Sequence, residues 1–459
     1  MVHRRDHARA DLRRPLAIPA DADECIAHRG DLIGDGAAGS LVDLRGRELG
    51  MREGLDGRRD RLAAVLRTAA AAGEERDDEQ TMHVRVVLFE SRHVKIRRVA
   101  RRSLPLVALV LALGTLIASA RVVAGGETWS DVRYHTEVAP PRLAAAEAIR
   151  SGALPAWWEG TGLGVPLAGE PSHGAMAPAI WLASSTRALD LILVAHLFWL
   201  ALGIAVWARR TTSETAAVVA GLLAITAGAI GSTAIRGALP SLAHLPWLGV
   251  AASLRGRRSI IGVGVALGAI GLGGQLAVLV DGVALALVIG RRDARLFVAI
   301  GAGLAIGLAQ WLPALLAIPH AAGVEVQAIP LSRLVELVVP GSFGSPDPDR
   351  GILAIGGASA WAPSVYLGAP LLALAAVRPV ARHLIGFLVG VAALGLVAGR
   401  GGWPGWLGAP ELHLAVLATA LAPLAAEGVE AFVAGERRAR LALAIGCGCA
   451  IVALGALAI

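Results

Sequence analysis

The sequence predicts an all-α integral membrane protein: a polytopic bundle of about 11 transmembrane helices, with a long first outer loop that contains interfacial helices. The first observation is composition, because 55% of the 459 residues are hydrophobic, 17% are charged and the mean hydropathy is +0.61. The second is that apolar runs near the ~20 residues needed to cross a ~30 Å hydrocarbon core recur along the chain. The third is that clusters of arginine separate alternate runs. A soluble protein of this length would not place so many apolar runs in series.

The first hundred residues differ from the rest of the chain. Residues 1–102 are polar and rich in Arg, Asp and Glu, and residues 1–81 show no sustained helical or strand periodicity. Such a segment buries too little apolar surface to offset its ordering entropy. We therefore expect a disordered cytoplasmic segment, which also lacks the apolar core of a secretory signal. An alternative is that translation begins at Met82. In both cases the predicted transmembrane domain covers residues 103–459.

The apolar runs of this second part give the predicted spans in order. Each run is rich in Ala, Leu, Val, Ile and Gly. The predicted spans are 103–123, 187–208, 214–235, 240–254, 259–274, 275–290, 296–317, 362–377, 382–399, 411–432 and 441–459.

Arginine positions orient these spans. Positive residues are enriched in cytoplasmic loops, so with a cytoplasmic N-terminus the inward connections should carry the arginines. They do, and the outer side then receives two long segments, 124–186 and 318–361. Long loops in a compact bundle tend to carry function, so we expect the functional residues there. The inward clusters are RRVARR (97–102), ARR (208–210), RGRR (255–258), RRDAR (291–295), RPVAR (378–382) and ERRAR (436–440).

The first outer loop opens with a polar stretch, GGETWSDVRYHTEVAPP, at 125–141. Pro140 and Pro141 suit a helix start and Gly152 suits a stop, so the sequence predicts a short helix over 140–152 that lies in the membrane interface. Its apolar face would consist of Leu143, Ala144, Ala145 and Ile149.

Two glycine-rich runs, 262–274 and 301–309, lie inside predicted spans. They lack the lysine of a phosphate-binding loop and do not join a strand to a helix. Small residues at three- and four-residue spacing are typical of helices that pack closely in membranes. We interpret both runs as helix-packing surfaces.

The placement of charge argues against a nucleic-acid-binding protein, and the cysteines argue against a disulfide-stabilised or zinc-binding protein. Much of the net charge of +7 falls in short clusters between apolar runs, so it does not indicate nucleic-acid binding. Cys25, Cys447 and Cys449 have neither a disulfide framework nor the spacing of a zinc site. No metal-ligand set is predicted.

Three segments, taken in order, resemble the YfhO-like family of bacterial membrane proteins, which belongs to the GT-C superfamily of integral-membrane glycosyltransferases. The first is the acid and tyrosine after the first span, followed by RSGALP and GLGVPLAGE. The second is IPLSRLVELVVPGSFGSPDP with SVYLGAPLLALAAV, and the third is GAPELHLAVLATALAPLAAEGVEAF. The resemblance covers about residues 104–435. Trp158 stands where the family usually has Asn, and the third segment lacks the family's basic residues.

The resemblance implies a glycosyltransferase-like protein of the bacterial plasma membrane. Such a protein transfers a sugar from a polyprenyl-phosphate carrier to an envelope glycan, lipid or protein on the outer face. In this superfamily an acid of the first outer loop acts as base or helps to bind a metal, and the matching residue is Asp131. A carboxylate near the membrane surface can accept a proton or orient a divalent metal. From the residues alone, Asp131 could equally cap a turn or pair with Arg133.

Six further residues are candidates for substrate binding. Two follow the candidate base, two are acids in the irregular part of the first loop, and two are arginines in later outer connections. The arginines could hold the carrier phosphate, because Arg binds phosphate in bidentate fashion. Each of the six could instead be a solvated loop residue or an interfacial anchor. They are Tyr134, His135, Glu159, Glu170, Arg236 and Arg333.

Three further acids, Asp281, Asp347 and Asp349, lie outside the first outer loop. Asp281 lies at or inside a predicted span, where the cost of burying an acid hints at function. Asp347 and Asp349, in SPDPDR, could form a metal site or simply be exposed loop residues.

The sequence also leaves two other functions open. One is a transporter or flippase of a lipid-linked substrate, although no internal repeat is visible. The other is a catalytically inactive membrane scaffold, which the departures from the family motifs would fit.

Overall fold

The computed structural model describes residues 104–125, 134–160, 164–290, 293–317, 334, 336–338, 364–378, 382–397 and 409–457. These residues are mostly helical and contain no strand beyond an isolated bridge between Trp158 and Val165. The predicted N-terminal segment, 1–102, lies outside the described residues, as does most of the second outer loop.

Each predicted span contains at least one helix of the described residues, and the spans 214–235 and 240–254 are each divided into two helices. The helices of these spans are α3 (Leu104–Ala118), α4 (Ala120–Val123), α6 (Thr186–Ala208), α7 (Glu214–Ile225), α8 (Gly228–Ile235), α9 (Leu239–Leu242), α10 (Leu245–Ala252), α11 (Arg257–Leu272), α12 (Leu276–Ile289), α13 (Ala294–Ala317), α14 (Ala369–Ala375), α15 (Arg382–Val397), α16 (Pro410–Val433) and α17 (Arg437–Leu457).

Length and composition identify the helices that could cross a membrane. Among the described residues, α6, α13 and α16 are long and apolar enough, and the pair α7 and α8 makes a fourth if its 54° bend is counted within one span. Helices α3, α12 and α15 are apolar but shorter. The apolar helices support the all-α membrane class, and the number of spans stays a prediction.

One predicted span is only partly helical. Within 362–377, α14 covers seven residues, and residues 364–368 before it are not helical. Their backbone groups bind other segments: Tyr366 O accepts from Ala229 N at 3.0 Å, and Leu367 N donates to Leu337 O at 3.1 Å. This stretch fits against the bend between α7 and α8, because a Cβ on Gly228 would lie 2.4 Å from Ser364 Oγ.

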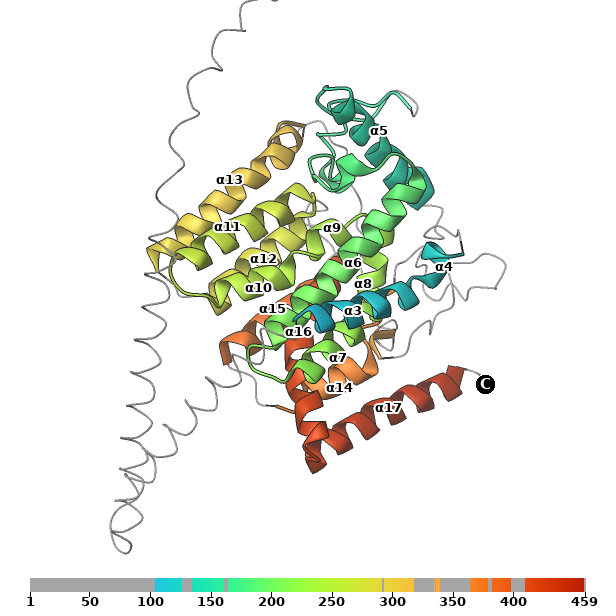
Figure 1. Cartoon of the computed structure of the whole chain (residues 1–459), viewed down its shortest axis with the longest axis vertical. Coiled ribbons are helices and arrows are strands. Elements are labelled where there is room, and N and C mark those ends of the chain that lie inside the picture. Colours follow the sequence, from blue (N-terminus) through green and yellow to red (C-terminus); the bar gives the residue numbers. More distant parts are fainter. Residues whose placement is uncertain are drawn as a thin grey trace, which may run out of the picture. The chain divides into compact units, whose positions relative to one another are not determined.

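Helix α16 lies at the centre of the described helices (Figure 1). It contacts α6, α7, α8, α10, α12, α14, α15 and α17. Residues 411–420 of α16 are buried on every side, and apart from Glu411, His413 and Thr419 they are apolar, as expected for a helix in the interior of a bundle.

The glycine-rich runs form the predicted packing surface. Helices α11 and α13 lie along each other (Figure 1). A Cβ on Gly271 would lie 2.9 Å from Gly307 Cα, and one on Gly303 would lie 2.6 Å from Leu267 Cβ. The two backbones therefore approach more closely than larger residues would permit, which confirms the interpretation of both runs as helix-packing surfaces.

Polar contacts divide the bundle into two ends. At one end, which we call the loop end, lies the first outer loop with helix α5 (Ala139–Arg150). At the other, the arginine end, α6, α10 and α16 terminate and arginines bind their surroundings. Arg209 pairs with Glu214 at 2.5 Å, Arg378 pairs with Glu436 at 2.7 Å, and Arg210 donates to Val250 O at 2.7 Å. Arg209, Arg210 and Arg378, which belong to the predicted inward clusters, thus bind where these helices end, away from α5 (Figure 1).

Candidate functional site at the loop end

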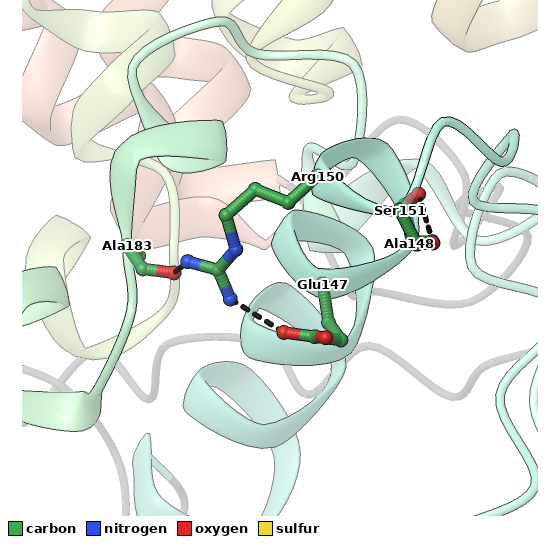
Figure 2. A network of polar contacts seen from close by, with 5 residues as sticks. All are labelled: Glu147, Ala148, Arg150, Ser151 and Ala183. Atoms are coloured by element: carbon green, nitrogen blue, oxygen red, sulfur yellow. Dashed lines mark hydrogen bonds and ion pairs between the residues drawn. The ribbon is translucent and has the colours of Figure 1, made fainter.

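Helix α5 is the main regular element of the described loop end. It starts at the predicted prolines, and Gly152 follows its end with φ +78°. Figure 2 shows how its last turn is tied to the chain before α6: Arg150 donates to Ala183 O at 2.7 Å and pairs with Glu147 at 2.7 Å. Beside it, Ser151 Oγ donates to Ala148 O (Figure 2). The last turn of α5 is therefore fixed to the end of the loop, just before α6.

The packed face of α5 differs from the predicted one. The sequence favoured a purely apolar face, whereas the buried side is centred on a charged residue, Arg142. This side of α5 is buried because the Arg142 guanidinium binds partners there, and not because of side-chain hydrophobicity alone. The buried residues are Ala139, Pro141, Arg142, Ala145 and Ala146.

Arg142 joins three segments of the chain. Its side chain is 0% exposed. Nε donates to His173 O at 2.9 Å, and Nη2 donates to Gly237 O and, at 3.5 Å, to Ser172 O. Burial lowers the pKa of Arg142 to about 10, so the side chain stays charged at neutral pH. Hydrogen bonds from a charged donor are about twice as strong as neutral ones, so Arg142 clamps α5, the loop and the turn after α8 together.

Two glycines shape this clamp. Gly237 has φ +73°, and a Cβ there would lie 2.6 Å from Arg142 Nη2. Gly274, between α11 and α12, has φ +82°, and a Cβ there would lie 1.7 Å from Pro171 O. Only glycine supplies both the left-handed backbone and the space. The loop therefore fits directly against the ends of the helices.

Helix α13 holds the loop from another side. The buried amide of Gln310 accepts from Met176 N at 2.9 Å and donates to Ala168 O at 3.4 Å. Within the loop, Trp181 Nε1 donates to Ala175 O at 2.9 Å. These contacts make the described part of the first outer loop a packed layer over the helix ends.

Tyr134, a predicted site residue, is fixed to α6. Tyr134 and Asp190 are both buried, and Tyr134 Oη donates to Asp190 Oδ1 at 2.7 Å. Burial, strengthened by this hydrogen bond, raises the pKa of Tyr134, so the phenol stays neutral. His135 is exposed and meets the Tyr134 ring edge-on, with 5.3 Å between centroids.

Asp131 itself lies outside the described residues, but the chain on both sides of it is anchored to α6. Arg187 Nη1 donates to Val122 O, and its Nη2 donates to Val123 O at 2.5 Å. On the other side, Tyr134 is held by Asp190.

Arg236 meets an acid that the sequence analysis did not single out. It follows α8, and Nη2 lies 3.5 Å from Glu411 Oε1 on the first turn of α16. The adjacent residue, Gly237, is the one that Arg142 binds. Arg236 is thus joined to the first outer loop through its neighbour.

Asp281, the acid predicted inside a span, has a buried partner. His413 Nδ1 and Asp281 Oδ2 lie 2.8 Å apart, with side chains 2% and 1% exposed. His413 is two residues after Glu411, so α16 contributes a polar side chain both to the contact with Arg236 and to the contact with Asp281. The sequence signalled Asp281 as an acid in an apolar run, but its partner lies 132 residues away.

The other predicted residues have different outcomes. Glu170 Oε1 accepts from Ser172 Oγ at 2.7 Å and so shapes the turn, Pro171–His173, that Arg142 holds. Glu159 is exposed and contacts none of the other candidates in the described part of the chain. Arg333 lies outside the described residues. The structure therefore brings Glu170 and Arg236 to the Arg142 clamp and leaves Glu159 apart.

Helix α6 carries further polar groups that the sequence analysis missed. His196 is buried and its ring lies 6.4 Å from that of His244, between centroids. Trp199 Nε1 contacts His244 Nδ1 at 3.4 Å and stacks on Trp247. The available signal was a polar residue inside an apolar run, the criterion that singled out Asp281.

Within the described ranges, no three His, Cys, Asp or Glu side chains lie close enough to hold a metal ion. Asp347 and Asp349 lie outside those ranges. A divalent metal therefore stays an expectation that belongs to the family resemblance. No protein-family model, curated protein or solved structure matches the chain.

Proposed function

We propose that this protein is a GT-C-like membrane glycosyltransferase whose loop end receives a polyprenyl-phosphate sugar. The observation that carries the proposal is the Arg142 clamp. It fixes the first outer loop to the turn that bears Arg236. The described part of the first outer loop and the turn that bears the candidate phosphate ligand therefore belong to one packed layer.

A membrane setting is supported by the surface of the helices. Large apolar side chains are exposed along α3 and α13, as expected where lipid replaces water. The arginine clusters gather at the end opposite the loop, which by the positive-inside rule would face the cytoplasm. The loop end would then face outward, where nucleotide sugars are not supplied and a lipid-linked donor is needed. The bilayer is thus both the setting and the source of the donor.

The chemistry assigns a role to each candidate. Asp131 takes the proton of an acceptor hydroxyl, and the oxygen forms a new bond to C1 of the sugar. The bond between C1 and the phosphate oxygen breaks, and the electron pair leaves with the polyprenyl phosphate. Arg236 stabilises this growing negative charge, because a preorganised cation acts most strongly in a site sheltered from water. Tyr134 and Glu170 fix the loop through Asp190 and Ser172, and His135 and Glu159, which are exposed, are assigned to the acceptor.

A second function has one observation in its favour. Asp281 and His413 form a buried hydrogen-bonded pair between α12 and α16, and paired ionisable residues within membrane helices mark transport and proton pathways. A transporter of a lipid-linked substrate would use this pair, whereas the transferase does not require it. An inactive scaffold would use neither this pair nor the candidate catalytic residue.

Purified full-length protein in detergent should separate these functions. We expect it to transfer label from a panel of radiolabelled polyprenyl-phosphate sugars to envelope glycans, since a detergent micelle has no two sides to transport between. Asp131→Asn and Arg236→Gln should abolish transfer. Asp293→Asn and Arg378→Gln, matched changes at the arginine end, should not. Absence of transfer by wild type, or equal transfer by Asp131→Asn, would contradict the proposal.

A further inference from the structure

We propose that a pocket between the starts of α11 and α13 binds the phosphate of an anionic lipid head group. The pocket follows α10 at the arginine end and contains none of the candidate residues of the loop end. Its volume is about 80 Å³, several times the roughly 10–15 Å³ that one water molecule needs. The polar side chains that line it are Arg255, Ser259, Asp293 and Arg295.

The two arginines of the pocket have no protein partner among the described residues. Arg255 and Arg295 are exposed, and within that part of the chain neither side chain forms an ion pair or a hydrogen bond. Other arginines of the same end differ, because Arg209 and Arg378 pair with acids at 2.5 and 2.7 Å. The guanidinium groups of the pocket are therefore available to a ligand.

The acid of the pocket already has a structural role. Leu296 N donates to Asp293 Oδ1 at 3.1 Å, so this carboxylate caps the start of α13. One carboxylate balances the charge of only one of the two arginines. The pocket therefore keeps a net positive charge, which favours an anion.

Two helix starts add to this charge. Helices α11 and α13 run in the same direction, because a Cβ on Gly264 would lie 3.4 Å from Ala299 O and one on Gly271 would lie 2.9 Å from Gly307 Cα. The positive ends of both helix dipoles thus lie beside the arginines. Gly256, which precedes α11, provides no side-chain cap, so the first N–H groups of this helix can also bind an anion.

A lipid phosphate fits both the donors and the surface around them. Arginine binds phosphate through two parallel charge-assisted hydrogen bonds, and Ser259 adds a hydroxyl donor. Large apolar side chains are exposed within one turn of the pocket on both helices: Ile261 of α11 is 56% exposed and Phe297 of α13 is 57% exposed. Acyl chains can cover such a surface while the head group enters the pocket, and basic pockets between membrane helices are typical sites for anionic head groups. The occupant is therefore a lipid phosphate and not a soluble one.

The test is native mass spectrometry of the full chain in a non-ionic detergent, titrated with dioleoylphosphatidylglycerol. Dioleoylphosphatidylcholine, which has the same acyl chains and a zwitterionic head group, is the lipid control. Arg255→Gln combined with Arg295→Gln should weaken binding of the first phosphatidylglycerol about tenfold or more, because charge-assisted hydrogen bonds are lost. All substituted side chains are exposed, so the melting temperature should stay that of wild type.

The matched control is Arg257→Gln combined with Arg258→Gln. It removes the same charge at exposed positions beside the pocket that do not line it, and binding should change by less than about twofold. Equal weakening by both pairs of substitutions would show attraction by surface charge alone and would refute the pocket.

Two further outcomes would overturn the proposal. If wild type binds phosphatidylcholine as tightly as phosphatidylglycerol, the pocket does not select an anionic head group. If inorganic phosphate displaces the lipid at an equal concentration, the free ion is the ligand and the lipid assignment is wrong. Asp131→Asn should leave lipid binding unchanged, so this proposal and the transferase proposal fail independently.

Discussion

Removal of the buried cation at position 142 should open the loop end selectively. Arg142→Met keeps the length and packing of the side chain but has no donors. It leaves the carbonyls of His173 and Gly237 without their hydrogen bonds, at a cost of about 1–3 kcal/mol each. The variant also no longer buries a charge, which offsets part of the loss. We therefore expect a net cost at the low end, about 2–3 kcal/mol, for docking the loop.

The assay is hydrogen exchange of backbone amides measured by mass spectrometry. A cost of this size raises the population of the open loop by about 30- to 150-fold, since each ~1.4 kcal/mol is a factor of ten. Protection should fall by that factor in residues 167–177 and 236–243 and stay unchanged in α17. The control is Arg150→Met on the same helix, whose side chain is 38% exposed and should cost under about 1 kcal/mol. Unchanged protection near residues 173 and 237 would refute the clamp.

Three other perturbations test the layer over the helix ends by thermal unfolding. Tyr134→Phe leaves buried Asp190 without its 2.7 Å donor and should cost about 1–3 kcal/mol; an unchanged melting temperature would contradict this. Burial lowers the pKa of His173 below 6.5, so the folded state resists protonation. The neutral His173 side chain therefore contributes to the stability of the fold above pH 6.5, and this contribution is lost as the pH falls through the lowered pKa. His173→Gln should flatten this pH dependence. Gly274→Ala should destabilise the protein far more than Gly152→Ala. Both glycines have positive φ, but only a Cβ at position 274 would collide with the backbone of another segment. Equal effects of the two substitutions would argue against tight docking of the loop.

Local sequence patterns were sufficient to predict the helices. The prolines at 140 and 141 and Gly152 delimit α5, because each acts through its own backbone. The apolar runs predicted α6, α13 and α16 within a few residues, and the glycine spacing predicted two helix-packing surfaces, which the structure places against each other in α11 and α13. These features depend on the period of the helix and on residues close in the chain.

The charge pairs could not be predicted in the same way. Arg142 looks like an ordinary surface residue of a short helix, and its role depends on carbonyls 31 and 95 residues away. Glu411 and His413 acquire partners only when α16 packs beside α8 and α12. The bend after α7 also has a tertiary cause, since residues 364–368 bind its backbone. Polar residues in apolar runs were the usable signal, and they pointed to Asp281 but not to its partner.

The orientation of the loop end is the premise on which the account depends, and cysteine accessibility tests it most directly. The three native cysteines are first replaced by serine. Glu159→Cys and Arg257→Cys, both at exposed positions, are then introduced separately and treated with a membrane-impermeant maleimide. We predict that position 159 is labelled in intact cells and that position 257 is labelled only after permeabilisation. Labelling of position 257 in intact cells, with position 159 protected, would contradict it.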